Sequence, residues 1–257
     1  MNTTDNLKNS LVYPFKDPMW MQKVAIAVLL ACGGMIIPLI PSLLFMGYLM
    51  QIMTDIIVEN KSAALPDWTD WGGYLKQGIK LFGVKMVYTL PGVILLGLTI
   101  GLTFVLSFAM PFFGESLERE PFLLLLLFFS IFGIIIVTNL ISTILLGLGY
   151  IMVPPAVCRI VQTGRFTSAF EISGWWQIVR KNVIGFVVVT LMLLGMASLL
   201  YVAFYWTYFF VFCCAAIIVV WMAVGVYFLL VASAAYASAY RQAMDAQEHN
   251  SGGMANV

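Results

Sequence analysis

The feature that most constrains this chain is a series of apolar runs that are too long for the core of a soluble domain. A membrane-spanning helix needs about 20 consecutive apolar residues. The longest run, Val183–Tyr240, has 58 residues and therefore has room for two such helices. Three shorter runs precede it: Val24–Val58, Ile79–Phe113 and Phe122–Val157. We predict an all-α, polytopic integral membrane protein with five transmembrane helices, or six.

The composition argues against the main soluble classes. Hydrophobic residues make up 62% of the 257 residues and charged residues only 10%, whereas about 25% of the residues in soluble proteins are charged. Too few charges remain to cover a surface that faces water, so a soluble enzyme or a disordered chain is a poor interpretation. The net charge of +1 offers no basic surface for a nucleic acid.

The first run is too long for one straight transmembrane helix, because its 35 residues would extend about 52 Å. We prefer a single helix that kinks at Gly33-Gly34 and at Pro38 and Pro41 and then continues into the cytoplasm. The alternative is a turn at residues 38–41 between two short spans, which would place the N-terminus inside.

The third and fourth runs raise the same question of where helices end. A polar patch in the third run, formed by Thr138, Asn139, Ser142 and Thr143, is either a turn or a packing seam. We prefer the seam, because a turn would put one of two basic connections outside the cell. The fourth run is expected to divide near Tyr205–Tyr208, where aromatic residues cluster as they do at a membrane interface.

Lysine and arginine residues in the connections predict the orientation. Residues 59–85 and residues 159–181 each contain four of them, whereas the short loop 112–121 contains three Glu and one Arg. Cytoplasmic loops of membrane proteins are enriched in Lys and Arg. The two long connections are therefore expected in the cytoplasm and the acidic loop outside.

Three regions are expected along the chain. Residues 1–22 mix charged and aromatic side chains with Pro14 and Pro18, which indicates an interfacial segment. Residues 23–240 are expected to form a single transmembrane domain, and residues 241–257 a disordered tail. The aromatic residues expected at the level of the lipid headgroups are Tyr13, Phe15 and Trp20.

A weak internal repeat relates two halves of the transmembrane region. Gly47 and Gly149 each begin a Gly-Tyr pair at the end of an apolar run, and Trp71 is matched by Trp175 at a similar offset. Both copies are followed by a basic connection, so the repeat is parallel rather than inverted. The halves are residues 23–113 and 122–210, with the last span, 209–240, outside the repeat.

The two basic connections are expected to form cytoplasmic amphipathic elbow helices at the membrane surface. In the first, Pro66 favours an extended start and Asp67 or Asp70 can cap the following helix. Tryptophan rings suit the headgroup region, and neighbouring cations attract anionic lipid. An interfacial anchor is the simpler interpretation, and a docking surface for a partner or a lipid headgroup is the alternative. The candidate contact residues are Trp68, Trp71, Lys76, Trp175, Trp176, Arg180 and Lys181.

Several motifs in a set order resemble a known family. They are Tyr13-Pro14-Phe15, Asp17-Pro18, Trp20, Gly47-Tyr48, Leu65-Pro66, Trp68, Asp70-Trp71-Gly72, Gly78 and Tyr88 with Leu90-Pro91. The set resembles an uncharacterised prokaryotic family of multi-pass membrane proteins, the domain of unknown function numbered four-zero-one-three, up to about Cys158. The resemblance implies a protein of the bacterial or archaeal cytoplasmic membrane, and it carries no activity or site residues with it.

Motifs for catalysis or metal binding are absent from the sequence. No His-Glu-x-x-His, Gly-x-Ser-x-Gly or phosphate-binding loop occurs, and the only histidine, His249, lies in the polar tail. The four cysteines lie within or at the end of apolar runs, which is typical of small buried side chains. We therefore expect no cofactor, no metal site and no enzymatic activity.

Polar groups at mid-membrane are few. Asn139, with Thr138 and Ser142, forms a candidate intramembrane seam, for which hydrogen bonding between helices is the simplest role. Lys85 is the cation expected deepest in the membrane, and its side chain is expected to extend back toward the headgroups.

These features favour a non-catalytic role. We expect a scaffold, an assembly factor or an accessory subunit of a membrane protein complex. Its expected partners are membrane lipids and other membrane subunits or a second copy of the chain, and no nucleic acid. A transporter or lipid-handling protein is the alternative, favoured by the repeat and the polar seam, and a membrane enzyme comes third.

Overall fold

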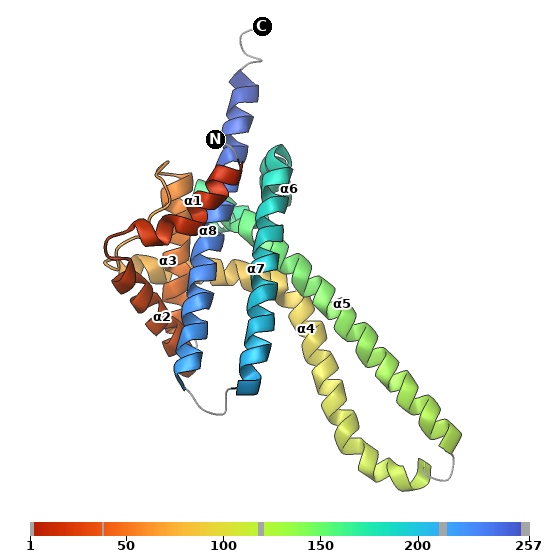
Figure 1. Ribbon diagram of the computed structural model, residues 1–257. Helices are drawn as coiled ribbons and strands as arrows, with labels where there is room; N and C mark the ends of the chain where they lie inside the picture. Colours follow the sequence, from red (N-terminus) through yellow and green to blue (C-terminus); the bar gives the residue numbers. More distant parts are fainter. Residues whose placement is uncertain (1–2, 38, 118–120, 211–214, 253–257) are drawn as a thin grey trace. The chain divides into compact units, whose positions relative to one another are not determined.

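The computed structural model describes residues 3–37, 39–117, 121–210 and 215–252, with side chains described for 8–37, 39–109, 122–123, 125–203 and 219–247. Every element within these ranges is a helix (Figure 1). The elements are α1 (Thr3–Lys16), α2 (Trp20–Ile36), α3 (Ile40–Ile57), α4 (Trp71–Leu117), α5 (Pro121–Thr163), η1 (Phe166–Phe170), α6 (Ile172–Val179), η2 (Arg180–Asn182), α7 (Val183–Phe210) and α8 (Ala215–Gly252).

Five helical segments in the described residues are long and apolar enough to cross a membrane. The prediction of an all-α, multi-pass membrane protein is therefore confirmed. The long fourth run divides between α7 and α8, slightly after the aromatic cluster that was expected to mark the break. The five segments are Ile40–Ile57, Trp71–Ala109, Leu125–Thr163, Ile172–Ala203 and Val219–Gln247.

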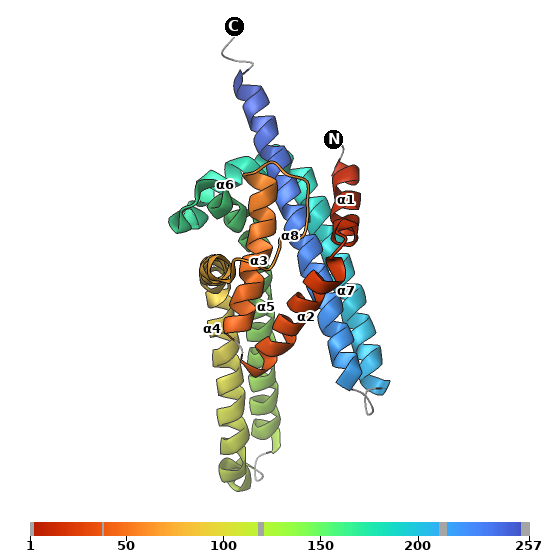
Figure 2. The ribbon, with the colours of Figure 1, turned by 90° about the vertical axis from the view of Figure 1, so that its left-hand side faces the viewer.

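The first apolar run forms two helices, so the preferred single kinked helix is wrong. α2 ends at Ile36, and α3 begins at Ile40 with a proline in its first turn. The two helices pack against one another as the arms of a hairpin (Figure 2). Gly33 and Gly34 lie near the start of α3 in this hairpin and do not kink a continuous helix. Proline lacks the amide that a helix interior needs, which favours a break here.

The N-terminal segment is helical and packs on the rest of the fold. α1 continues through Pro14, and a bend of 100° separates it from α2. Tyr13 is buried, and its hydroxyl donates a hydrogen bond to the Leu230 carbonyl oxygen of α8 at 3.0 Å. In return, the Tyr227 hydroxyl of α8 donates to the Leu11 carbonyl oxygen at 2.9 Å. Tyr13 therefore lies in the protein core and not among lipid headgroups, whereas Phe15 is exposed.

The chain separates into two compact units, and the single transmembrane domain expected for residues 23–240 stays a prediction. Unit 1 comprises Met1–Val84 and Pro154–Val257, and unit 2 comprises Lys85–Val153. In unit 1, α3 and α8 lie side by side at the centre (Figure 2) and bury their facing sides. The largest fully buried side chains of that centre include Tyr48, Ile52, Leu230 and Tyr240.

Unit 2 is a pair of long helices that contact one another through small residues. At Gly92 of α4, an added Cβ would press on Leu146 of α5, and Ser142 of α5 donates to the Gly92 carbonyl oxygen at 2.8 Å. Few residues of this pair are buried, and most of its large apolar side chains are exposed. Such a surface is stable only against lipid or other apolar helices.

The polar tail predicted to be disordered is helical as far as Gly252, because α8 continues through it. Tyr240 and Ala243 are buried, and the Arg241 guanidinium donates to the Ile56 and Ile57 carbonyl oxygens at the end of α3, both at 3.2 Å. These contacts order a segment whose composition alone indicates disorder. Residues 253–257 lie outside the described part of the chain.

Candidate functional site: the Lys23 junction

The first connection has no helix of its own before Trp71. Asn60 adopts a φ of 56°, and the Lys61 amide bonds the Asp55 carbonyl oxygen at 2.9 Å, so the chain turns back after α3. The following residues remain without helix, as expected where a proline restricts the residue before it. Asp70 then caps α4, because its carboxylate accepts a hydrogen bond from the Gly73 amide at 2.8 Å. One of the two predicted capping residues is thus confirmed.

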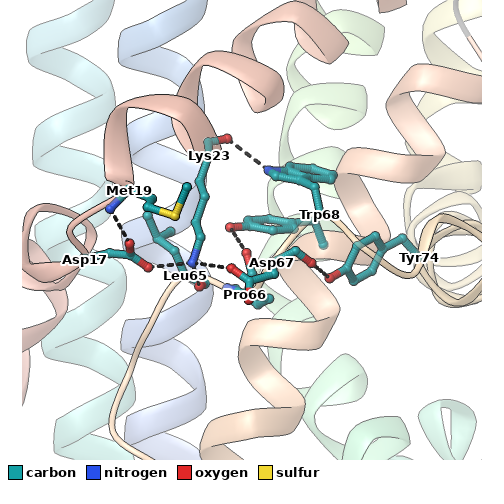
Figure 3. Close-up of polar contacts among 9 residues, drawn as sticks. Asp17, Met19, Lys23, Leu65, Pro66, Asp67, Trp68 and Tyr74 are labelled. Carbon is teal, nitrogen blue, oxygen red and sulfur yellow. Dashed lines mark hydrogen bonds and ion pairs between the residues drawn. The ribbon is translucent and has the colours of Figure 1, made fainter.

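This connection meets the N-terminal segment at the Lys23 junction, which we define as Asp17, Lys23, Tyr48, Leu65–Trp68 and Tyr74 (Figure 3). The Lys23 ammonium contacts the Asp17 carboxylate at 2.6 Å and the Asp67 carboxylate at 2.8 Å. It also donates to the Leu65 carbonyl oxygen at 2.8 Å. A lysine ammonium has three N–H groups, so these three acceptors satisfy it completely.

An aromatic stack covers the junction. The rings of Tyr48 and Trp68 lie parallel with their centroids 4.0 Å apart. The Trp68 indole donates to the Lys23 carbonyl oxygen at 3.0 Å, and the Tyr48 hydroxyl donates to the Pro66 carbonyl oxygen at 3.0 Å. The Tyr74 hydroxyl donates to the Asp67 carbonyl oxygen at 2.5 Å. Aromatic side chains thus bind the carbonyl oxygens of Pro66 and Asp67, which lie outside any helix, and one carbonyl oxygen of α2.

Two glycines allow the helices around the junction to approach closely. A Cβ added to Gly47 of α3 would collide with the backbone of Tyr74. A Cβ added to Gly78 of α4 would collide with the Leu43 carbonyl oxygen. Both positions therefore require the absence of a side chain, which explains why these glycines occur within helices despite their low helix propensity.

The charges of the junction stabilise one another. The hydrogen bond from the Lys23 ammonium holds the pKa of the Asp17 carboxyl below its ordinary value, and a bond from the Met19 amide at 2.7 Å acts in the same direction. Both Lys23 and Asp17 are largely shielded, with side-chain exposures of 12% and 15%. The Asp67 side chain is 72% exposed, so the junction borders a polar environment.

The predicted tryptophan pairs each divide into one inward and one outward ring. Trp68 lies in the junction and Trp175 is buried, with its indole bonded to the Ala169 carbonyl oxygen at 3.1 Å. Trp71 and Trp176 are exposed, at 43% and 45%. The indoles of Trp68 and Trp175 thus find their polar partners within the protein, and the placement of the four rings at the membrane surface stays a prediction. The predicted contact cations Lys76, Arg180 and Lys181 are exposed.

The second connection folds into η1, α6 and η2. The Ser168 hydroxyl bonds the Arg165 carbonyl oxygen at 2.6 Å, which closes the turn after α5. Asn182 donates to the Ala239 carbonyl oxygen of α8 at 3.1 Å. This connection is thus fastened to the same central helix as the N-terminal segment.

The predicted polar seam lies on α5 and forms only one bond between helices. The Asn139 amide and the Thr138 hydroxyl bond carbonyl oxygens of their own helix, at 2.9 and 2.8 Å. Ser142 alone bonds the neighbouring helix, as described above. The Lys85 ammonium lies over the Tyr150 ring, 5.6 Å from its centroid. The structure does not bring these four residues together into one polar site.

The polar groups of the Lys23 junction bind one another and hold α2 to the first connection. Among the described residues, no group of three or more metal-ligating side chains occurs. Sequence reasoning did not identify Lys23, Tyr48 or Tyr74 as members of this site. A usable signal was present for Lys23, since it is a single charge at the start of a long apolar run, and such a charge usually needs a partner.

Comparison with known families identifies the chain by its sequence. Residues 30–207 match the family model DUF4013, described as a protein of unknown function. The match extends past Cys158 and begins after the N-terminal motif, so it covers a different segment from the resemblance noted in the sequence. No curated protein and no solved structure matches the chain. The match covers more than half of the sequence, and the chain belongs to the DUF4013 family.

Proposed function

We propose that this protein is a non-catalytic scaffold or accessory subunit of a membrane protein complex in the cytoplasmic membrane of a bacterium or archaeon. The observation that carries the proposal is the saturation of Lys23 by Asp17, Asp67 and the Leu65 carbonyl oxygen. A lysine that acts in catalysis or transport must bind or release a proton or a ligand. Here every N–H group is already used to hold two segments together.

The polar groups of unit 2 support the same proposal. The side chains of Asn139, Thr138 and Thr143 bond backbone carbonyl groups of their own helix. Ser142 bonds the backbone of α4. Side chains that satisfy backbone groups in this way act as glue between and within membrane helices, and a hydrophilic pathway would need them free.

The surfaces that remain for a partner are apolar and aromatic. Trp71 and Trp176 are exposed in unit 1, and α4 and α5 expose large apolar side chains in unit 2, among them Phe104 and Phe129. Exposed apolar helices in a bilayer contact either lipid or other helices. A scaffold would bind its partner subunit through part of this surface and lipid through the rest.

Photo-crosslinking in living cells tests the proposal. Benzoylphenylalanine is placed singly at Phe104, Phe129, Trp71 and Trp176, and adducts are identified by mass spectrometry. A scaffold is expected to give the same protein adduct at two or more neighbouring positions, and an adduct with its own chain would indicate a homo-oligomeric scaffold. Adducts with lipid alone at all four positions would contradict the proposal.

Solvent access to the seam tests the alternative of a transporter. Asn139→Cys and Ser130→Cys are compared in a background in which the four native cysteines are replaced by alanine. A scaffold is expected to leave position 139 unreactive toward a water-soluble thiol reagent in vesicles. Rapid reaction at 139 but not at 130 would favour a transport pathway.

A further inference from the structure

The geometry points to a re-entrant hairpin: α2 and α3 enter the bilayer from the side that holds Asp67, turn inside the hydrocarbon and leave on the same side. The apolar surface at the turn of this hairpin contacts the acyl chains of the membrane lipids. The inference concerns which helices cross the membrane, so it holds independently of the proposed function.

The base of the hairpin is fixed at a polar level. Lys23 near the start of α2 binds Asp67 (Figure 3). Tyr48 of α3 stacks on the adjacent Trp68. The Asp67 carboxylate is 72% exposed. An exposed carboxylate in hydrocarbon costs several kcal/mol, so this level belongs to the headgroup region or to water. Lys23 and Asp67 therefore lie on one side of the membrane, and α3 cannot be a lone crossing between them.

The arms beyond this level are too short to cross. Ile36, the last residue of α2, lies 13 residues after Lys23, which gives a rise of about 20 Å in a helix. Ile40, the first residue of α3, lies eight residues before Tyr48, a rise of about 12 Å. The hydrocarbon core is about 30 Å thick, so the turn stops inside it.

The turn has the composition of a segment that remains in hydrocarbon. No charged residue occurs between Val24 and Thr54. The exposed large residues around the turn are all apolar, with exposed fractions between 58% and 84%: Met35, Ile36, Ile37, Leu39 and Ile40. The break between α4 and α5 differs, since residues 115–120 contain three Glu and one Arg, and the last turns of α7 before its break to α8 contain the aromatic residues of 205–208. Charged and aromatic residues are typical of a far interface, and this turn has neither.

The backbone at the turn limits the cost of leaving polar groups in lipid. The Ile37 amide is bonded to the Gly33 carbonyl oxygen at 2.8 Å, and the Leu39 carbonyl oxygen accepts from the Leu43 amide at 2.9 Å. Pro38 and Pro41 have no amide hydrogen, so they add no unpaired donor where water is absent. The hairpin then contributes no net crossing, which leaves α4, α5, α7 and α8 as the four full spans.

Thiol accessibility at the turn tests the inference. Ile37→Cys and, separately, Leu39→Cys are made in the alanine-substituted background, with Ser62→Cys and Ser116→Cys as references on the two sides. Membrane-impermeant maleimide is applied to right-side-out and to inside-out vesicles. We expect positions 37 and 39 to react at least about tenfold more slowly than either reference from both sides, because a thiolate does not form in hydrocarbon. Full reaction after solubilisation in denaturing detergent shows that the thiols are present.

Depth measurement distinguishes a buried turn from one covered by protein. A nitroxide attached at position 37 is expected to collide frequently with oxygen and rarely with a water-soluble nickel complex. Reaction of position 37 or 39 on the side that labels Ser116→Cys would show two full crossings and overturn the inference. Reaction on the side of Ser62→Cys would show a surface loop and overturn it equally, and low collision with both oxygen and nickel would show that protein, not lipid, covers the turn.

Discussion

The Trp68 indole donates a hydrogen bond to the Lys23 carbonyl oxygen at 3.0 Å, across 45 residues of sequence. The same lysine returns two bonds to the segment that carries Trp68, through the Asp67 carboxylate and the Leu65 carbonyl oxygen. Helix α2 and the first connection are therefore held together by hydrogen bonds donated from both sides. Loss of either residue should loosen both segments.

Replacement of Lys23 by methionine should destabilise the protein by roughly 2 kcal/mol, because two carboxylates and a carbonyl group lose their donor. The measurement is the thermal midpoint in a mild detergent. Lys61→Met is the control, since the Lys61–Glu59 pair is fully on the surface and such pairs contribute little. In a double-mutant cycle, Asp17→Asn should cost much less in the Lys23→Met background than in the wild type. Additive effects would mean that the two groups do not interact.

Acid should weaken the junction through Asp17. Its pKa is lowered in the folded protein, mainly by the bond from Lys23, so its contribution to stability is complete above the ordinary carboxyl pKa of about 3.9. The contribution is lost as the pH falls through the lower folded-state value. The thermal midpoint should therefore drop as the pH falls below about 4, and Asp17→Asn should reduce this drop. An unchanged pH dependence in the variant would exclude Asp17 as the titrating group.

Alanine at Gly78 should cost about 1–3 kcal/mol, because its Cβ would push α4 away from the Leu43 carbonyl oxygen of α3. Gly97→Ala is a matched control on the same helix, since a Cβ there meets nothing within 4 Å. Alanine has a higher helix propensity than glycine, so Gly97→Ala should leave the thermal midpoint unchanged or raise it. Equal midpoints for the two variants would contradict the close approach.

Phenylalanine at Trp68 or Trp175 should lower stability by about 1 kcal/mol, because each indole loses its hydrogen bond to a backbone carbonyl oxygen. The exposed tryptophans Trp71 and Trp176 serve as controls, and their replacement by phenylalanine should change the free energy of unfolding by less than about 0.5 kcal/mol. Thermal unfolding of the four variants in the same detergent provides the comparison. A larger effect at the outward positions would reverse the assignment.

Both connections should face the cytoplasm, because their Lys and Arg residues indicate it. Single cysteines at Ser62, Ser116 and Thr167 can be labelled in intact cells with an impermeant thiol reagent, in the alanine-substituted background. Only position 116 should react. Labelling at 167 but not at 62 would require an extra turn within α5, which the continuous helix Pro121–Thr163 does not contain.

The sequence alone determined the class of the protein and most of its helices. Run length and composition decide these features, because an apolar segment of about 20 residues has one stable solution in a bilayer. The cap at Asp70 and the division of the last run also followed from local rules. The parallel repeat and the elbow geometry stay predictions. The two tyrosines of the repeat lie in different environments, since Tyr48 is buried and Tyr150 is exposed.

Only the tertiary structure decided which polar and aromatic residues act together. Lys23 and Asp67 are 44 residues apart. They meet only because α3 turns back along α2 and the connection after α3 then reaches Lys23. The same holds for Tyr13. The sequence predicts it among the lipid headgroups, but its hydroxyl donates a hydrogen bond to the Leu230 carbonyl oxygen of α8. A tryptophan or tyrosine ring satisfies its polar group equally well with a headgroup or with a carbonyl group of the protein. The choice between them depends on packing between distant helices, which periodicity and composition do not encode.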